Sequence, residues 1–211
     1  MKIDQHTDPM AYQPDMEITS SAIMEQVLAA RAAYDETVYT EDDVKQALLQ
    51  DHLTPEAFAA LLAPAAAPFL EQLAQRAQAE TRKHFGNAVN LFTPLYIANY
   101  CENHCIYCGF NCYNNIKRAK LTAAEIETEM QAIAAQGLEE ILILTGESPN
   151  MSDVHYIGAA CRLARKYFRV VGLEVYPMDS SDYAYLHQCG ADFVTVFQET
   201  YAPDKYGQLH L

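Results

Sequence analysis

Three cysteines lie close together in the segment CENHCIYCGF, which covers residues 101–110. Cys101, Cys105 and Cys108 have the spacing C-x3-C-x2-C, and the aromatic residue Tyr107 stands directly before the last of them. Three thiolates on one short loop can bind three irons of a [4Fe–4S] cluster and leave the fourth iron open, whereas a cluster held by four cysteines is closed and usually only transfers electrons. The spacing therefore predicts cluster chemistry on a bound cofactor.

Zinc is the alternative metal for such a loop. Structural zinc sites have four tetrahedral nitrogen or sulfur ligands, usually from two closely spaced pairs. Here no second pair follows at the spacing of a zinc finger, although Cys112 or His104 could supply a fourth ligand. The pattern favours a cluster over zinc. A disulfide framework is favoured least, because the 6 cysteines are not evenly distributed and the start of the chain does not read as a signal peptide.

The chain is acidic. Its 28 Asp and Glu residues against 14 Lys and Arg give a formal net charge of −14 and a pI of about 4.8. This charge disfavours nucleic acids and anionic membranes as partners, and no apolar stretch approaches the length that crosses a bilayer. We expect a cytoplasmic globular protein without a nucleic-acid or membrane partner.

Residues 1–86 are expected to form an N-terminal arm and a helical extension. The two prolines before Ser20 favour an extended arm, and Ser20 or Ser21 is a candidate cap for the first helix. Thr54 followed by Pro55 is a strong helix start, because proline has no amide hydrogen that the first helical turn would leave unpaired.

Residues 87–211 predict an α/β fold. Strand-like and helical segments alternate, which requires parallel strands joined by right-handed crossovers. The strands are nearly continuous apolar runs, as expected where both faces of a sheet are covered. An eight-stranded barrel needs about 250 residues, so we expect the first half of a TIM-type (β/α) barrel, with its C-terminal half absent. The predicted strands are residues 89–97, 140–144, 170–176 and 193–197, and the predicted helices between them are 122–136, 153–166 and 180–190.

Polar residues follow each predicted strand. In parallel α/β sheets, ligands bind at the carboxyl ends of the strands. The cysteine loop follows the first strand and Glu147, in the sequence TGE, follows the second. Glu174 and Tyr176 end the third strand, and Gln198 and Glu199 follow the fourth. These residues are therefore candidates for one active-site rim.

Two further groups have simpler interpretations. The basic residues Lys117, Arg118 and Lys120 follow the cysteine motif, and we favour a solvated approach to the next helix over contact with the cysteine loop. Cys161 and Cys189 lie in or near predicted helices and are expected to pack in the core.

The loop CENHCIYC, placed after the first strand of a half or full barrel, resembles the signature of radical S-adenosylmethionine (SAM) enzymes. Longer segments are similar to the 2-iminoacetate synthase family, the tyrosine lyases of thiazole formation in thiamine biosynthesis. The resemblance covers roughly residues 16–211, and it is strongest in LLAPAAAPFLEQLAQRAQ, FGNAVNLFTPLYIANYCENHCIYCGFNCYNNIKRAKL, ILILTGE and FVTVFQETY. A related family, the tyrosine lyases of [FeFe]-hydrogenase maturation, shares the same first half and adds a second cluster on C-terminal cysteines.

The resemblance implies that Cys101, Cys105 and Cys108 hold a [4Fe–4S] cluster whose open iron binds the amino and carboxylate groups of SAM. Glu147 matches the family's GGE-type element, which receives the methionine ammonium through a charge-assisted contact. Only three thiols are needed, so Cys112 is expected to be a free thiol.

Four further residues receive looser roles from the resemblance. Tyr107 and Phe110 are expected to contact the adenine of SAM. Glu174 and Tyr176 are expected to contact ribose, methionine or tyrosine.

The implied reaction uses an external one-electron donor. The reduced cluster cleaves SAM to methionine and a 5′-deoxyadenosyl radical, which takes hydrogen from L-tyrosine. The tyrosine Cα–Cβ bond then breaks to give 2-iminoacetate (dehydroglycine) and p-cresol. A complex with thiazole synthase is the expected partnership. The alternatives are the hydrogenase-maturation lyase and a cluster- or zinc-binding module without catalysis.

Overall fold

The computed structural model describes residues 22–210, so the predicted caps Ser20 and Ser21 lie outside the described residues. The described residues form two compact units, which divide after residue 89. The sequence placed this division after residue 86. Residues 22–89 are helical, and residues 90–210 contain a sheet with helices.

The helical unit begins its second and third helices with threonine caps. Thr40 and Asp43 form a capping box, in which each side chain accepts a hydrogen bond from the other residue's backbone amide. Thr54 accepts from the Ala57 amide, as the Thr–Pro start predicted. The elements are α1 (Ile23–Ala33), α2 (Glu41–Leu49), α3 (Pro55–Leu62), the 3-10 helix η1 (Pro64–Phe69) and α4 (Leu70–Phe85).

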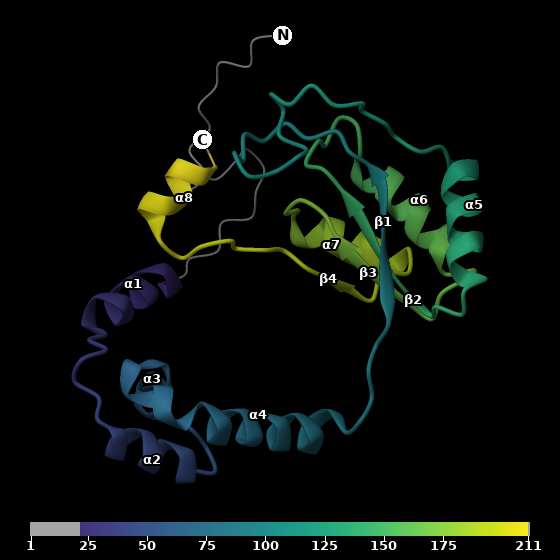
Figure 1. Ribbon diagram of the computed structural model, residues 1–211. Coiled ribbons are helices and arrows are strands. Elements are labelled where there is room, and N and C mark those ends of the chain that lie inside the picture. Colours follow the sequence, from purple (N-terminus) through teal and green to yellow (C-terminus); the bar gives the residue numbers. More distant parts are fainter. Residues whose placement is uncertain (1–21, 211) are drawn as a thin grey trace. The chain divides into compact units, whose positions relative to one another are not determined.

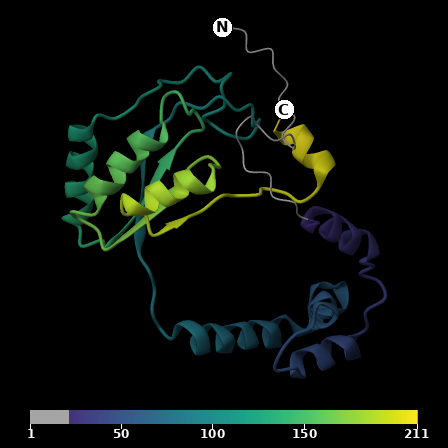
Figure 2. The same ribbon diagram turned by 180° about the vertical axis from the view of Figure 1, so that it is seen from behind.

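Four parallel strands form the sheet of the second unit, in the order β1-β2-β3-β4. They alternate with helices, and α5, α6 and α7 all lie on one side of the sheet (Figures 1 and 2). The predicted β-α-β alternation is therefore confirmed. The strands are β1 (Phe92–Ala98), β2 (Glu140–Thr145), β3 (Val170–Glu174) and β4 (Phe193–Val194), and the helices are α5 (Ala123–Ala134), α6 (Val154–Ala164), α7 (Ser180–Gln188) and α8 (Pro203–Leu209).

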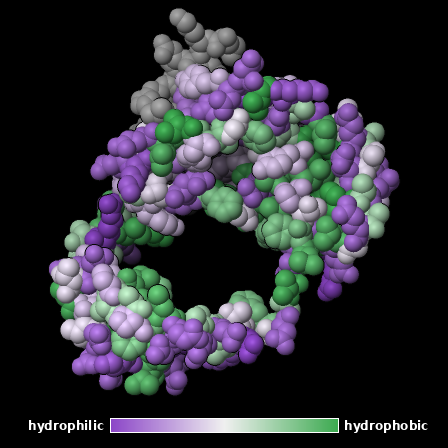
Figure 3. Space-filling model, viewed as in Figure 1, coloured by the Kyte–Doolittle hydropathy of each residue, from purple (hydrophilic) through white to green (hydrophobic). Residues whose placement is uncertain are grey.

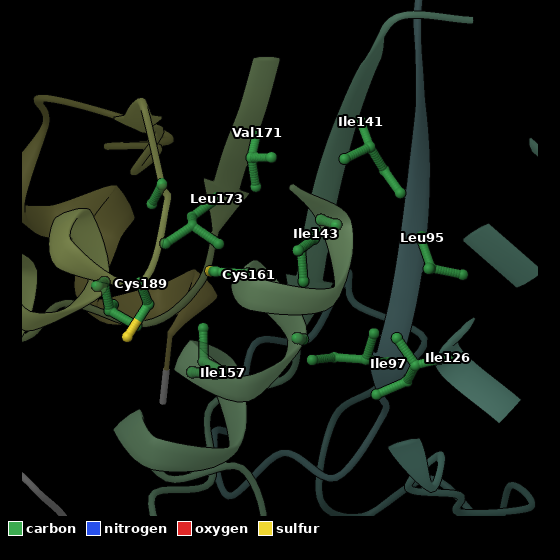
Figure 4. Close-up of a cluster of buried hydrophobic side chains, with 14 of the residues drawn as sticks. Leu95, Ile97, Ile126, Ile141, Ile143, Ile157, Cys161, Val171, Leu173 and Cys189 are labelled. Atoms are coloured by element: carbon green, nitrogen blue, oxygen red, sulfur yellow. The ribbon is translucent and has the colours of Figure 1, made fainter. Parts of the chain in front are cut away.

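The helix-covered face of the sheet holds the main core. Alternate strand residues point to one face of a sheet, and here this face is formed by branched aliphatic side chains that pack against α5, α6 and α7 (Figure 4). The predicted core cysteines Cys161 and Cys189 are buried among them. The strand contributions are Leu95, Ile97, Ile141, Ile143, Val171 and Leu173.

The other face of the sheet is partly open. Phe92 and Tyr96 of β1 are about half exposed there. The ring of Phe193 lies directly over Gly172, where a Cβ atom would come within 2.3 Å of the ring. Hydrophobic residues gather over the strands when the unit is viewed from this side (Figure 3).

The fourth strand is shorter than predicted. Its ladder covers only Phe193 and Val194, and Thr195 adds one further hydrogen bond from its amide to the Leu173 carbonyl. A few residues later Glu199 has φ 64°, in the left-handed region that residues other than glycine rarely adopt. The chain therefore leaves the sheet before the end of the apolar run.

Side-chain caps start the helices that follow β1 and β2. Thr122 and Glu125 form the predicted capping box at α5, with the Glu125 carboxylate 2.7 Å from the Thr122 amide nitrogen. At α6 the Asp153 carboxylate accepts from the Tyr156 amide at 2.8 Å. These caps fix where each crossover turns back along the sheet.

An ion pair joins helix and strand at the amino ends of the strands. The Arg165 guanidinium donates two hydrogen bonds of 3.1 Å to the two carboxylate oxygens of Asp192. The same carboxylate accepts from the Val171 amide at 2.8 Å, at the start of β3. This network lies at the opposite end of the strands from the cysteine loop.

No single helix among residues 22–210 is long and apolar enough to cross a membrane. One bent pair, α3 with the continuous stretch from η1 through α4, passes the same criteria of length and composition when taken together.

Candidate functional site

The cysteine loop leaves the carboxyl end of β1 and returns beside it. Lys120 forms an antiparallel bridge with Ala98, and the Leu121 amide donates to the Ile97 carbonyl at 2.8 Å. Further out, the Asn99 amide donates to the Ala119 carbonyl at 3.1 Å. Residues 99–119 therefore form one loop that is closed at its base.

All three predicted ligand cysteines lie on this loop as partly exposed free thiols. The Cys108 amide donates to the Cys105 carbonyl at 3.1 Å, which makes a tight turn between these two residues. Burial raises the pKa of Cys105, and the neighbouring Cys101 and Cys108 thiolates raise it further. The three thiols therefore share one loop that is closed at its base.

This donor set fits a cluster with three thiolate ligands. No three His, Cys, Asp or Glu side chains in the described part of the chain meet at one point, as the ligands of a single ion do. A cluster takes each thiolate on a different iron, so it needs three thiols around a space and not at a point. At the end of β2, the buried Thr145 hydroxyl has no hydrogen-bond partner among the described residues, so the rim also holds an unused polar atom.

Two asparagines that the sequence reasoning overlooked hold the shape of the loop. The Asn111 side chain is buried and donates to the Cys105 carbonyl at 2.9 Å. The side-chain amide of Asn114 donates to the Cys108 carbonyl at 3.2 Å. Asparagine favours loops because its side chain bonds to nearby backbone, and the run NCYNN after the last cysteine was the available signal.

The turn after β2 lies directly against the cysteine loop. A Cβ atom on Gly146 would be 2.3 Å from the Tyr100 carbonyl oxygen, so only glycine fits this approach. The Glu147 carboxylate accepts a 2.6 Å hydrogen bond from the Asn103 side-chain amide, and its main-chain carbonyl accepts from the Glu102 amide at 2.8 Å. The TGE segment and the cysteine loop are thus brought together, as their places after β1 and β2 predicted.

Helix α8, which the sequence did not predict, contacts the other side of the loop. The Tyr107 hydroxyl is 2.6 Å from Nε2 of His210, and the Ile106 amide donates to the Leu209 carbonyl at 3.0 Å. The His210 ring stacks on Tyr206, with ring centroids 4.0 Å apart. Burial raises the pKa of the Tyr107 hydroxyl, and the Cys105 thiolate raises it further.

The remaining predicted residues take different positions. Phe110 packs edge-on against Tyr96 on the open face of the sheet, with centroids 5.2 Å apart. Burial raises the pKa of Glu174, and the charge of Glu199 raises it further. Tyr176 donates its hydroxyl to the Ser152 carbonyl at 2.8 Å, a contact within the fold.

One prediction about the basic residues was wrong. Arg118 does not face solvent, because its guanidinium donates to main-chain carbonyls of the cysteine loop. Lys117 and Lys120 are exposed, as expected, although the Lys120 ammonium lies 4.3 Å from the centre of the Tyr156 ring. Arg118 also lines a cavity beside the loop, together with Cys101 and Cys112.

The fold and the loop together define a parallel α/β protein whose three loop cysteines and acidic turn meet at the carboxyl ends of the strands. Residues 95–210 match the Radical SAM superfamily, and the chain belongs to this superfamily. The [4Fe–4S] cluster and SAM predicted from the sequence are the cofactors of this superfamily.

Two curated proteins are similar to this chain in sequence. The chain is 44% identical over 172 residues to the 2-iminoacetate synthase of Escherichia coli K12, covering 82% of this chain and 46% of that protein. It is 30% identical over 161 residues to the 3-methylornithine synthase of Methanosarcina acetivorans, covering 75% of this chain and 46% of that protein. The chain thus spans about half the length of the curated relatives it matches.

A solved structure agrees with the fold. The crystal structure of HydG, a maturase of the [FeFe]-hydrogenase, superimposes with a TM-score of 0.77 at 26% sequence identity, covering 90% of this chain and 44% of that chain. The predicted fold class, part of a radical SAM TIM-type barrel, is confirmed.

Proposed function

We propose that this chain carries the cluster-binding part of a radical SAM lyase that cleaves the Cα–Cβ bond of L-tyrosine. The products are 2-iminoacetate and p-cresol, with methionine and 5′-deoxyadenosine formed from SAM, and the 2-iminoacetate serves thiazole formation in thiamine biosynthesis. The observation that supports this most is the three-cysteine loop packed against the Gly146–Glu147 turn, in a chain 44% identical to a 2-iminoacetate synthase.

When bound, the cluster and SAM supply one-electron cleavage of SAM and hydrogen abstraction from the substrate. The protein holds and orients these groups. Cys101, Cys105 and Cys108 would hold three irons of the cluster. The Asn103 amide, 2.6 Å from the Glu147 carboxylate, fixes that carboxylate at the edge of the loop, where it can accept an ammonium group.

The aromatic residues around the loop shape its surroundings. Tyr107 and Phe110 flank the last cysteine and offer ring faces for the adenine of SAM. Glu174, with a raised pKa, and Tyr176 lie at or just beyond the end of β3, where they are candidates for the ribose, methionine or tyrosine. An external one-electron donor and thiazole synthase are the proposed partners, and the cytoplasm is the proposed compartment.

The hydrogenase-maturation lyase is the second candidate, because HydG shares the fold with a TM-score of 0.77. Sequence identity favours the first candidate, at 44% for 2-iminoacetate synthase against 26% for HydG. Both candidates begin with the same cleavage of tyrosine, so one assay of p-cresol tests the reaction that they share.

The test starts with anaerobic reconstitution of the chain, followed by iron and sulfide analysis and EPR of the reduced protein with and without SAM. We expect about four irons per chain and a spectrum that changes with SAM. Glu147→Ala should keep the iron and weaken the change with SAM. Stoichiometric zinc without iron would contradict the proposal and support a structural metal module.

The second step is to add L-tyrosine and a chemical reductant and to measure p-cresol and 5′-deoxyadenosine. Formation of both supports the lyase. A chain that binds iron and SAM and gives 5′-deoxyadenosine without p-cresol would show that the cofactor site is complete and that tyrosine cleavage by this chain alone is not supported.

A further inference from the structure

The base of the cysteine loop is closed by hydrogen bonds of Asn99 in addition to the pairing beside β1. Three hydrogen bonds join Asn99, at the start of the loop, to residues 117 and 119 at its end: Asn99 N to Ala119 O at 3.1 Å, Asn99 Nδ2 to Lys117 O at 2.9 Å, and Ala119 N to Asn99 Oδ1 at 2.7 Å. The two ends of the loop therefore meet at one asparagine.

Arg118 reaches from this base into the loop. Its Nη1 atom donates to the Asn99 carbonyl at 2.7 Å and to the Phe110 carbonyl at 2.8 Å, and its Nη2 atom donates to the Asn111 carbonyl at 2.7 Å. One side chain thus connects Asn99, two residues before the first cysteine of the motif, to Phe110 and Asn111, two and three residues after the last. The segment that carries the three thiols lies between these attachment points.

The connection continues from Arg118 to a cysteine. Asn111, whose carbonyl Arg118 holds, is only 7% exposed, and its side-chain amide donates to the Cys105 carbonyl at 2.9 Å. The Cys105 carbonyl also accepts from the Cys108 amide at 3.1 Å. A shift of the Asn111 backbone would therefore move the turn that sets the spacing of two thiols.

We propose that Arg118 is a positioning residue that holds the three-cysteine loop in its ligand-ready shape before the cluster binds. In this role it acts through the main-chain carbonyls of Asn99, Phe110 and Asn111. The inference rests on the proposed cluster site and assigns one residue outside the motif to its construction.

Arginine suits this position because its guanidinium is a rigid planar fork with several donors and a permanent charge. Lysine keeps the charge but has a single nitrogen on a flexible stem, so it cannot reach carbonyls on both sides of the loop in the same way. Charge-assisted hydrogen bonds are also stronger than neutral ones. The planar, multi-donor shape of the guanidinium, and not its charge alone, should therefore determine how well the loop is held.

The experiment measures alkylation of each cysteine in the cluster-free protein by peptide mass spectrometry. The loop cysteines Cys101, Cys105 and Cys108 report on the loop, while Cys161 and Cys189 are buried in the core and report on unfolding of the whole unit. In Arg118→Gln we expect the loop thiols to react about tenfold faster, because losing even one charge-assisted hydrogen bond changes a local opening equilibrium by this factor.

Arg118→Lys should give an intermediate rate, and Lys117→Gln, which removes an exposed neighbouring charge, should match the wild type. Wild-type rates at the loop thiols of Arg118→Gln would overturn the proposal. Equal acceleration of alkylation at Cys161 and Cys189 would also overturn it, because it would show that Arg118 stabilises the whole unit. A wild-type alkylation rate at the loop thiols of Arg118→Lys would overturn it as well.

Cluster loading gives a separate readout. Iron per chain after reconstitution should fall in Arg118→Gln and remain unchanged in Lys117→Gln, and equal iron in both variants would overturn the proposal. If wild-type protein takes up no iron, the proposed function fails, while alkylation of the cluster-free protein still decides whether Arg118 holds the loop.

Discussion

Replacing Gly146 by alanine tests the contact between the turn after β2 and the cysteine loop. The new Cβ atom would lie 2.3 Å from the carbonyl oxygen of Tyr100, 2.9 Å from its carbonyl carbon and 3.0 Å from the Cβ atom of Cys101. Two of these atoms belong to the main chain, so rotation of a side chain cannot remove the collision. Either the turn or the start of the loop must move.

The size of the effect follows from this geometry. Overpacking a well-packed site costs about 1–3 kcal/mol, and contact with main chain places this substitution near the upper end, at about 2–3 kcal/mol. For a unit of this size, that loss lowers the unfolding midpoint by roughly 10 °C. Gly109→Ala is the matched control, because no heavy atom lies within 4 Å of its added Cβ atom. Its stability should change by less than about 0.5 kcal/mol.

The assay follows thermal unfolding of the cluster-free protein by circular dichroism and by alkylation of Cys161. This thiol is fully buried in the sheet unit and therefore reports on that unit separately from the helical one. The expected result is a lower midpoint for Gly146→Ala and little change for Gly109→Ala. A Gly146→Ala protein that unfolds at the wild-type midpoint would falsify the close approach described above.

Three further outcomes are expected. Tyr156→Phe removes the hydroxyl that lies 2.8 Å from the carbonyls of Ile97 and Leu121, so urea unfolding should show a loss of about 1 kcal/mol; wild-type stability would contradict this role. Hydrogen bonds from Thr122 lower the pKa of Glu125, so its contribution to stability is present above the ordinary carboxyl pKa and is lost as pH falls through the lowered value. Glu125→Gln should therefore show a weaker decrease in melting temperature between neutral and acidic pH, and equal pH dependence of the two proteins would argue against the cap. Cys112→Ser should keep about four irons per chain, whereas Cys108→Ser should not; equal losses would make Cys112 a ligand.

Local signals in the sequence predicted much of the fold. The Thr54–Pro55 start and the Thr122–Glu125 capping box are formed as expected, because both depend on residues within one helical turn. The alternation of strands and helices was also predictable from apolar runs and their spacing. The cysteine loop after β1 followed from its motif alone.

Features that depend on distant residues were not predictable in the same way. Helix α8 has only seven residues, and such short helices depend on tertiary contacts, here with Ile106 and Tyr107. The role of Arg118 required knowing that the chain returns to Asn99 after the loop. The apolar run 193–197 did not indicate that β4 ends at Val194 or that Glu199 adopts a left-handed backbone.

The Arg165–Asp192 pair and its hydrogen bond to Val171 have a consequence for how the sequence of such a protein can evolve. They secure the amino ends of the strands, whereas the thiols and Glu147 lie at the carboxyl ends. Substitutions in the network at the amino ends should alter stability and leave the loops at the carboxyl ends in place, whereas exposed loop residues at the carboxyl ends can change without touching this network. Lineages can therefore exchange one substrate for another through the loops while inheriting the same supporting end unchanged.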